Sequence, residues 1–258
     1  MVDKEKVNHG PDTWAVDITG LSFRYRHDQE ALRDINLRIR QGERLAVIGP
    51  NGAGKSTLLM HLNGILRGTG SVRICGMPVS GKSIPEIRAK VGLVFQDPDD
   101  QLFCPTVFED VAFGPMNLGF RKEEILERVN TALEQVGLAD CRDRSAFHLS
   151  GGEKKRVALA TVLALDPEIL ALDEPSVNID PRHRRRLLNW LKAFSKTLVI
   201  ATHDLDFALT ICDRCVLLNV GRVVADGPSR KILRDRELLE ANDLELPLCL
   251  QGPPDRER

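Results

Sequence analysis

Alternation of apolar and polar residues dominates the first part of the chain. The segments AVDITGLSFRYR and ALRDINLRIR, within residues 14–40, place an apolar residue at about every second position. Because successive side chains of a strand point to opposite faces, this pattern predicts antiparallel strands with one face in water. GSVRICGMPV predicts a further hairpin, and CVLLNVGRVVADG predicts a last one with its turn near Gly221.

Four other apolar runs lack alternation, which is typical of strands buried on both faces of a parallel sheet. They are ERLAVIG, the end of IRAKVGLVFQ at Gln96, EILALDEP and KTLVIATH. Between the second and the third run, residues 97–165 change to a period of about 3.6, seen in TVFEDVAFGPMNLG and KEEILERVNTALEQVGL. The order predicts an α/β core with an α-helical lobe inserted into it.

The charge distribution argues against a nucleic-acid-binding protein. The 258 residues are 42% hydrophobic and 28% charged, so a packed core is expected, and the net charge of −1 gives no global basic field. One basic run, RHRRR at 182–186, lies in a segment that predicts a helix capped by Asp180. A solvated helix face explains this run better than a nucleic-acid patch, because Leu187, Leu188 and Leu191 supply a buried side.

The apolar runs are all far shorter than the ~18 residues that a membrane-spanning helix needs. The start of the chain, MVDKEKVNHGPD, is polar and lacks the apolar core of a signal peptide. We therefore expect a cytosolic protein that reaches a membrane only through a partner. Cys212 and Cys215 form a single C-x-x-C without the second pair of a zinc site, so Cys215 is predicted to be a small buried residue.

A phosphate-binding loop follows the run ERLAVI. GPNGAGKST matches G-x-x-x-x-G-K-[ST] at its fixed positions and precedes a segment with helical spacing. The glycines let backbone N–H groups surround phosphate oxygens, and the helix N-terminus adds its positive dipole end. Lys55 is expected to reach the β- and γ-phosphates, and Ser56 to offer its hydroxyl to Mg²⁺. The loop comprises Gly49, Pro50, Asn51, Gly52, Ala53, Gly54, Lys55, Ser56 and Thr57.

Two carboxylates follow another buried run. Asp173 and Glu174 come at the carboxyl end of EILALDEP, where open α/β sheets place their ligands. Asp173 is predicted to hold Mg²⁺, and Glu174 to polarise the attacking water. A plain strand–loop junction with two surface acids is the alternative, and the phosphate loop argues against it.

The stretch HLSGGEKKRVALA, from His148, has two interpretations. Ser150 and Glu153 fit the capping box S-x-x-E, which makes a well-capped helix. A helix that begins with Ser-Gly-Gly is also an anion site. The spacing of these residues alone does not separate the two.

Taken together, GPNGAGKST, LSGGEKKR and LALDEP resemble the nucleotide-binding subunit of an ATP-binding cassette (ABC) transporter, over about residues 16–227. The resemblance implies a P-loop NTPase (RecA-like) ABC ATPase core with an antiparallel β subdomain and an inserted α-helical subdomain. It also implies ATP and Mg²⁺ as cofactors, and two cassettes facing head to tail. The γ-phosphate held by one chain would then be bound by Ser150 and Gly152 of the other, with Gly151 between them.

The resemblance assigns four more residues. Tyr25 falls where the family has an aromatic ring under adenine, and Gln96 matches the glutamine that contacts Mg²⁺ and the attacking water and joins the core to the lobe. His203 matches the histidine that contacts the γ-phosphate. Asp180 matches the loop that communicates across the dimer, a role compatible with capping a helix.

The stretch QDPDDQLFCPTVFEDVAFGPMNLG is similar to the ATPases of energy-coupling-factor and cobalt/nickel uptake systems. This implies a motor at the cytoplasmic face of the cell membrane, with integral membrane subunits and a second cassette, identical or paralogous, as partners. The expected substrate is a transition-metal ion, cobalt or nickel. Expected divisions are a tail (1–13), an ABC ATPase domain (14–230) containing the helical subdomain (about 97–165), and a short extension (231–258).

Three alternatives remain open on the sequence. The first is vitamin uptake through the same kind of machine. The second is a soluble ABC ATPase of translation or DNA repair, which usually carries two cassettes or a long coiled coil. The third is a simple P-loop kinase, which would have no use for LSGGE.

Overall fold

The computed structural model describes residues 14–26 and 30–251, and the predicted tail at 1–13 lies outside them. The alternating segments form the predicted antiparallel sheet, with strand order β2-β1-β4-β5. Its apolar positions, such as Ile18 and Ile35, are fully buried against the rest of the core. The strands are β1 (Trp14–Arg24), β2 (Glu30–Arg40), β4 (Thr69–Ile74) and β5 (Met77–Pro78).

A second, six-stranded sheet forms the centre of the molecule, with strand order β10-β9-β3-β8-β7-β6. The five strands from β9 to β6 are parallel, and β10 pairs with β9 in an antiparallel hairpin. Burial on both faces explains the unbroken apolar runs. The strands are β3 (Arg44–Ile48), β6 (Val91–Val94), β7 (Ile169–Asp173), β8 (Thr197–Thr202), β9 (Arg214–Asn219) and β10 (Arg222–Pro228).

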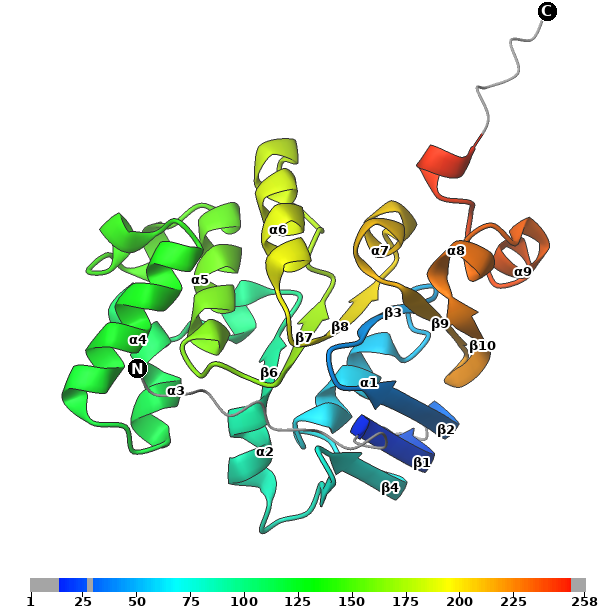
Figure 1. The fold of residues 1–258 in the computed structure, drawn as a ribbon, viewed down its shortest axis with the longest axis horizontal. Coiled ribbons are helices and arrows are strands. Elements are labelled where there is room, and N and C mark those ends of the chain that lie inside the picture. Colours follow the sequence, from blue (N-terminus) through cyan, green and yellow to red (C-terminus); the bar gives the residue numbers. More distant parts are fainter. Residues whose placement is uncertain (1–13, 27–29, 252–258) are drawn as a thin grey trace, which may run out of the picture.

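The predicted helical lobe stands to one side of the six-stranded sheet (Figure 1). It is inserted between β6 and β7 and contains α3 (Val107–Asn117), α4 (Lys122–Gln135) and α5 (Gly151–Leu163). Capping boxes start two of the three helices, at Thr106 for α3 and at Ser150 for α5. Their apolar faces join the larger of the two hydrophobic clusters, so the lobe is packed continuously with the core.

The other helices flank the six-stranded sheet, with α1 on the side of the antiparallel sheet and α6 and α7 on the opposite side (Figure 1). Two of the short helices, α2 and α7, were not expected from the sequence. The helices are α1 (Lys55–Leu62), α2 (Ile84–Lys90), α6 (Pro181–Ala193), α7 (Leu205–Ile211), α8 (Ser229–Ile232) and α9 (Arg236–Glu240). Short 3₁₀ turns lie at Pro98–Asp100, Ala139–Cys141, Ala146–His148 and Leu248–Leu250.

Residues beyond β10 pack onto the core. Leu233, Leu239 and Leu244 are buried within the larger hydrophobic cluster. The carboxylate of Asp206, near the start of α7, accepts the backbone N–H groups of Leu248 and Cys249 at 2.8 and 2.9 Å. The C-terminal extension is therefore anchored beside the helix that follows β8.

Candidate functional site

Four neighbouring strands place the predicted site residues at one edge of the sheet. The strands β3, β8, β7 and β6 are parallel and adjacent, so their carboxyl ends lie together. The phosphate loop follows β3, His203 follows β8, Asp173 ends β7, and Gln96 comes two residues after β6. The fold thus brings together groups as far apart in sequence as Gly49 and His203.

At two positions of the phosphate loop, the backbone conformation and the close neighbours leave room only for glycine. Gly49 has φ 153°, and a Cβ there would lie 2.0 Å from the carbonyl oxygen of Leu218. Gly54 has φ 105°, and its Cβ would lie 2.5 Å from the carbonyl oxygen of Ala31. The loop therefore lies directly against neighbouring backbone at these two positions.

The remaining loop residues are open to solvent or support the turn. Asn51 and Gly52 are exposed, and a Cβ on Gly52 would meet nothing within 4 Å. Ala53 is buried, and its carbonyl accepts the N–H of Gly221 at 3.1 Å. Lys55 is 6% exposed and its Nζ donates to the carbonyls of Gly49 and Pro50 at 2.8 and 3.1 Å. The lysine side chain therefore folds back onto the phosphate loop.

Asp173 is a buried carboxylate with an unused oxygen. Its Oδ1 has no hydrogen-bond partner, which leaves a buried acceptor free for a cation. Burial raises the pKa of Asp173, while hydrogen bonding to Ser56 and the charge of Lys55 lower it. A carboxylate and a hydroxyl at the start of the phosphate-loop helix are oxygen ligands of the kind that Mg²⁺ prefers. These residues fit a magnesium ion.

Glu174 lies at the centre of a hydrogen-bonded cluster. It is 4% exposed and has φ 45°, a left-handed backbone conformation that non-glycine residues rarely adopt. Its Oε1 lies 2.9 Å from Nδ1 of His203 and 3.6 Å from Nζ of Lys55. The Thr202 hydroxyl donates to Oε2 at 3.0 Å, and the His203 N–H donates to Oε1 at 3.1 Å. The two adjacent acids therefore have different surroundings, and only Glu174 contacts the histidine.

Tyr25 comes after the end of β1, beside the phosphate-loop helix. The residue is 39% exposed, and its hydroxyl lies 3.1 Å from Oγ1 of Thr57. An exposed aromatic residue next to the phosphate loop is suited to stacking on a nucleobase.

The start of α5 carries Ser150, Gly151 and Gly152 on the lobe. Ser150 is exposed, and its N–H and hydroxyl both donate to Oε2 of Glu153, at 2.8 and 2.7 Å. The predicted capping box is thus confirmed. A cavity of about 550 Å³ is lined by Gly151 together with residues of the core site. Those core residues are Ser56, Gln96 and Asp173.

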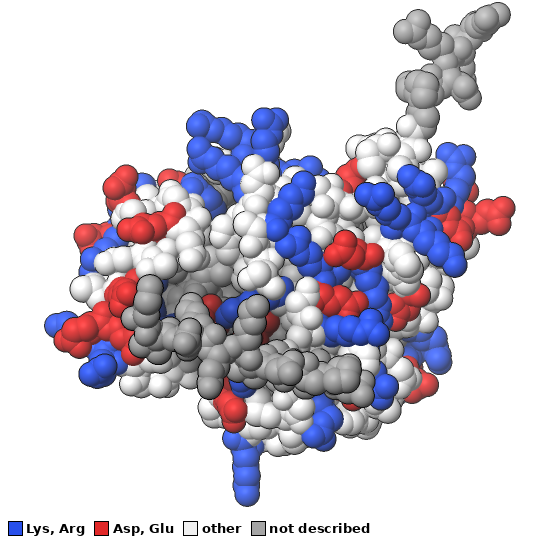
Figure 2. Space-filling view, viewed as in Figure 1, with Lys and Arg blue, Asp and Glu red and all other residues white. Residues whose placement is uncertain are grey.

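Asp180 caps α6 as predicted. Its Oδ1 accepts the N–H groups of Arg182 and His183 at 3.0 and 3.1 Å, and its Oδ2 bonds the His183 ring. Hydrogen bonding to His183 lowers the pKa of Asp180. Three arginines of α6 are exposed, Arg182, Arg185 and Arg186, and Figure 2 shows basic side chains gathered over the upper part of this helix.

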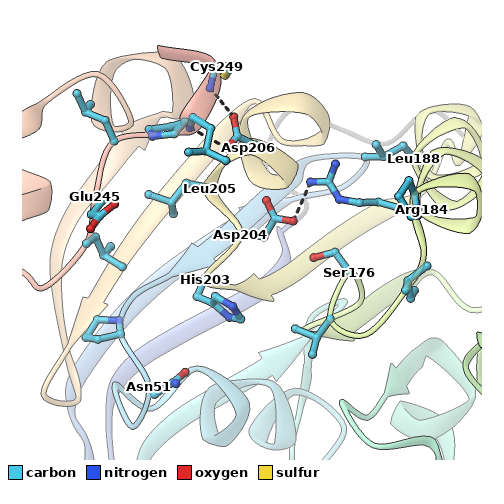
Figure 3. Close-up of a pocket in the computed structure, with 18 of the residues that line it drawn as sticks. Asn51, Ser176, Arg184, Leu188, His203, Asp204, Leu205, Asp206, Glu245 and Cys249 are labelled. Carbon is cyan, nitrogen blue, oxygen red and sulfur yellow. Dashed lines mark hydrogen bonds and ion pairs between the residues drawn. The ribbon is translucent and has the colours of Figure 1, made fainter. Parts of the chain in front are cut away.

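A larger cavity, of about 1160 Å³, is lined by His203. Figure 3 shows His203 between Asn51 of the phosphate loop and Ser176, which follows the Glu174–Pro175 pair. Arg184 closes part of it through an ion pair with Asp204 at 2.7 Å. The C-terminal extension, residues 243–249, forms the far wall.

Sequence reasoning missed one residue that connects the core to the lobe. The Gln101 amide donates to the carbonyl of Ala158 and to Oγ1 of Thr161, at 2.8 and 2.7 Å, while its oxygen accepts the N–H of Phe95. Gln96, expected to make this connection, is exposed and has no hydrogen bond to another described residue. Its side chain is therefore free to turn toward a bound cation or water. Gln101 belongs to the polar DPDDQ segment, so a polar contact could have been suspected there. Nothing in the spacing of this segment predicts that its partner lies on α5.

The cysteine pair is buried as expected for Cys215. Burial raises the pKa of both Cys212 and Cys215, the latter to about 12, so both thiols are protonated. Among residues 14–26 and 30–251, no group of three or more His, Cys, Asp or Glu side chains could hold a metal ion.

These features agree with the comparisons with known proteins. The sequence model of the ABC transporter family matches residues 32–177. An energy-coupling factor transporter ATP-binding protein, EcfA of Carboxydothermus hydrogenoformans, is 50% identical over 241 residues, 92% of this chain and 89% of that protein. The chain belongs to the ABC transporter ATP-binding family. It is an ABC ATPase, the ATP-binding motor component of a transporter.

Solved cassettes share the fold of this ABC ATPase. The structure of cbiO1 from Clostridium perfringens, described as part of the ABC transporter complex cbiONQ, superposes with a TM-score of 0.77 at 37% identity, covering 89% of this chain and 94% of that one. A dimeric post-hydrolysis structure of the cassette MJ0796, bound to ADP and Pi, gives a TM-score of 0.76 at 28% identity and covers 83% and 99%. In the part of the cassette that the structure describes, no helix is long and apolar enough to cross a membrane.

Proposed function

We propose that this ABC ATPase hydrolyses ATP with Mg²⁺ at the carboxyl edge of its six-stranded sheet and powers a membrane importer. One observation carries the proposal. Four adjacent parallel strands deliver a phosphate loop, a histidine, a pair of acids and a glutamine to the same edge. This combination supplies positive charge, metal ligands and a base for phosphoryl transfer.

Binding is assigned to residues around the phosphate loop. Tyr25 stacks on adenine, and residues 49–57 surround the phosphates, with the Lys55 ammonium moving from the loop carbonyls to the β- and γ-phosphates. Mg²⁺ is held by Ser56, Gln96 and Asp173, where the free Oδ1 of the aspartate is available. The ion neutralises charge on the phosphate oxygens when it is bound.

Hydrolysis is assigned to Glu174 and His203. Glu174 accepts a proton from water as the water oxygen attacks the γ-phosphorus and the bond to the β-phosphate oxygen breaks. His203 contacts the γ-phosphate, and its ring and backbone also hold one oxygen of Glu174. The Thr202 hydroxyl holds the other oxygen, so the carboxylate has one orientation before substrate arrives.

A second cassette, identical or paralogous, completes the site. Ser150, Gly151 and Gly152 lie at the start of α5, and in this proposal Ser150 and Gly152 bind the γ-phosphate held by the partner, with Gly151 between them. Asp180 lies on the loop between the two sites. The dimeric MJ0796 cassette supports this arrangement.

The transported substrate is proposed to be cobalt or nickel, with a vitamin as the alternative. The stretch QDPDDQLFCPTVFEDVAFGPMNLG, which is similar to cobalt/nickel uptake ATPases, supports the metal, and similarity to EcfA proteins supports a shared energy-coupling module. The subunit would lie at the cytoplasmic face of the cell membrane and bind integral membrane subunits. Three apolar side chains of the lobe suit such a contact, because Phe103, Phe113 and Met116 are 61%, 46% and 61% exposed.

The test is to tag this chain, purify it gently from native membranes, and identify the accompanying proteins by mass spectrometry, with an untagged strain as control. A membrane core with a metal-uptake subunit and no second ATPase would support a homodimeric cobalt or nickel importer. A paralogous ATPase with several vitamin-binding membrane subunits would select the vitamin alternative. Recovery with ribosomes or DNA and no membrane protein would overturn the importer.

A further inference from the structure

A closed circuit of contacts, formed by Tyr25, Phe23, His61 and Thr57, attaches Tyr25 to the phosphate-loop helix α1. Tyr25 and Phe23 form an edge-to-face pair, with ring centroids 4.9 Å apart and planes at 86°. Phe23 makes a second edge-to-face pair, at 4.9 Å and 74°, with His61 of α1. The tyrosine hydroxyl returns to the same helix, at Oγ1 of Thr57. The tyrosine side chain is thus held both at its ring, by Phe23, and at its hydroxyl, by Thr57.

His61 is the buried end of this circuit. The ring is 1% exposed, and its Nδ1 lies 2.7 Å from the backbone carbonyl of Thr57. A carbonyl only accepts, so Nδ1 carries the proton and Nε2 is an unprotonated nitrogen, buried and without a partner. Burial lowers the pKa of His61, although hydrogen bonding to Thr57 raises it. The ring is neutral and presents an aromatic surface to Phe23.

We propose that His61 and Phe23 are positioning residues for nucleobase recognition, which hold the ring of Tyr25 in the orientation that stacks on adenine. This rests on the proposed role of Tyr25. An exposed tyrosine at a strand end would otherwise occupy several rotamers, and binding would have to order it. The circuit orders the ring in advance. These contacts also connect the proposed nucleobase site and the phosphate site to the same helix, α1. The spacing of the two sites is then set by a rigid element.

The experiment separates base binding from phosphate binding. Dissociation constants of Mg-ADP and of inorganic pyrophosphate are measured by calorimetry on the purified chain and on His61→Ala, Phe23→Leu and His61→Phe. An aromatic pair contributes enough to change affinity by about threefold to tenfold. We expect His61→Ala and Phe23→Leu to weaken ADP by that factor and pyrophosphate by less than about twofold. His61→Phe keeps the ring and is expected to bind both ligands like the wild type.

Leu62→Ala is the matched control, because Leu62 is buried in the same helix and the same hydrophobic cluster. It loses buried volume without removing a ring and is expected to weaken the two ligands equally. A second comparison uses Tyr25→Ala. In that background His61→Ala should have no further effect on ADP, since there is no ring left to position.

Two results would overturn the proposal. One is equal weakening of ADP and pyrophosphate by His61→Ala and Phe23→Leu. The other is a full effect of His61→Ala in the Tyr25→Ala background. A wild-type chain that fails to bind ADP would instead contradict the proposed function, and a Tyr25→Ala variant that binds ADP normally would remove the tyrosine from the base site.

Discussion

At the scale of single residues, the two adjacent acids at the end of β7 are suited to two different proposed roles. Asp173 ends β7 with a free oxygen, which suits a cation. Glu174 turns away through its left-handed backbone, and its carboxylate is held by Thr202 and His203. The change of direction between neighbours gives the proposed metal ligand and the proposed base different surroundings.

Replacement of the proposed base tests this division. In Glu174→Gln the side chain keeps its size but no longer accepts a proton, so turnover is expected to fall by at least about 100-fold. ATP binding should persist, because the phosphate loop and Asp173 are unchanged. Phosphate release and nucleotide binding are measured side by side. The control is Glu168→Gln, which replaces an exposed acid just before the start of β7. Near-normal turnover of Glu174→Gln would show that Glu174 is not the base.

At the scale of elements, local patterns were enough to predict one hairpin turn and two helix caps. The last hairpin was predicted around Gly221, and the structure places Val220 and Gly221 at φ 45° and 73°, the positive values of a tight turn between β9 and β10. The caps at Ser150 and Asp180 were likewise predicted and are present. The α/β core with an inserted lobe followed from the order of periodic segments.

Other features depend on contacts that sequence does not reveal. The helix Ile84–Lys90 is only seven residues long, so its period could not be told from that of the strand that follows. The bridging role of Gln101 requires α5 to lie beside the loop after β6. The order of strands in the central sheet, which assembles the site, is likewise a long-range property.

The capping box of α5 makes a pH-dependent contribution. Hydrogen bonding to the Ser150 hydroxyl and N–H lowers the pKa of Glu153. A carboxyl with a lowered pKa stabilises the fold above its unfolded pKa of about 4.3, and this is lost as the pH falls through the folded value. Glu153→Gln keeps a capping box without the charge.

We therefore expect the wild type to be more stable than Glu153→Gln at pH 7, by about 0.3–1 kcal/mol in free energy of unfolding. The difference should shrink as the pH is lowered below about 4, toward the acid limit of folding. Urea unfolding of both proteins across this range measures it. A difference that stays constant with pH would show that the charge of Glu153 contributes nothing at the cap.

At the scale of the whole molecule, the stretch from Ser150 to Glu174 begins on the lobe and ends in the core. Its first residues are exposed, whereas its last two are buried at the nucleotide edge. In the proposed head-to-tail dimer these two ends serve different ATP molecules. The cap on α5 would then have two roles, since the geometry that starts the helix also leaves its first N–H groups directed outward.

Ser150→Arg and Ser150→Ala separate these two roles. Both lose the side-chain cap, at a cost of about 1 kcal/mol in stability, but only arginine adds bulk and charge at the interface. In a Glu174→Gln background with Mg-ATP, light scattering should show dimers for Ser150→Ala and monomers for Ser150→Arg. Nucleotide binding by the monomer should be the same in both. Asn130→Arg, on an exposed position of α4, controls for added charge. Dimers of equal amount in both Ser150 variants would mean that the start of α5 does not face a partner's nucleotide.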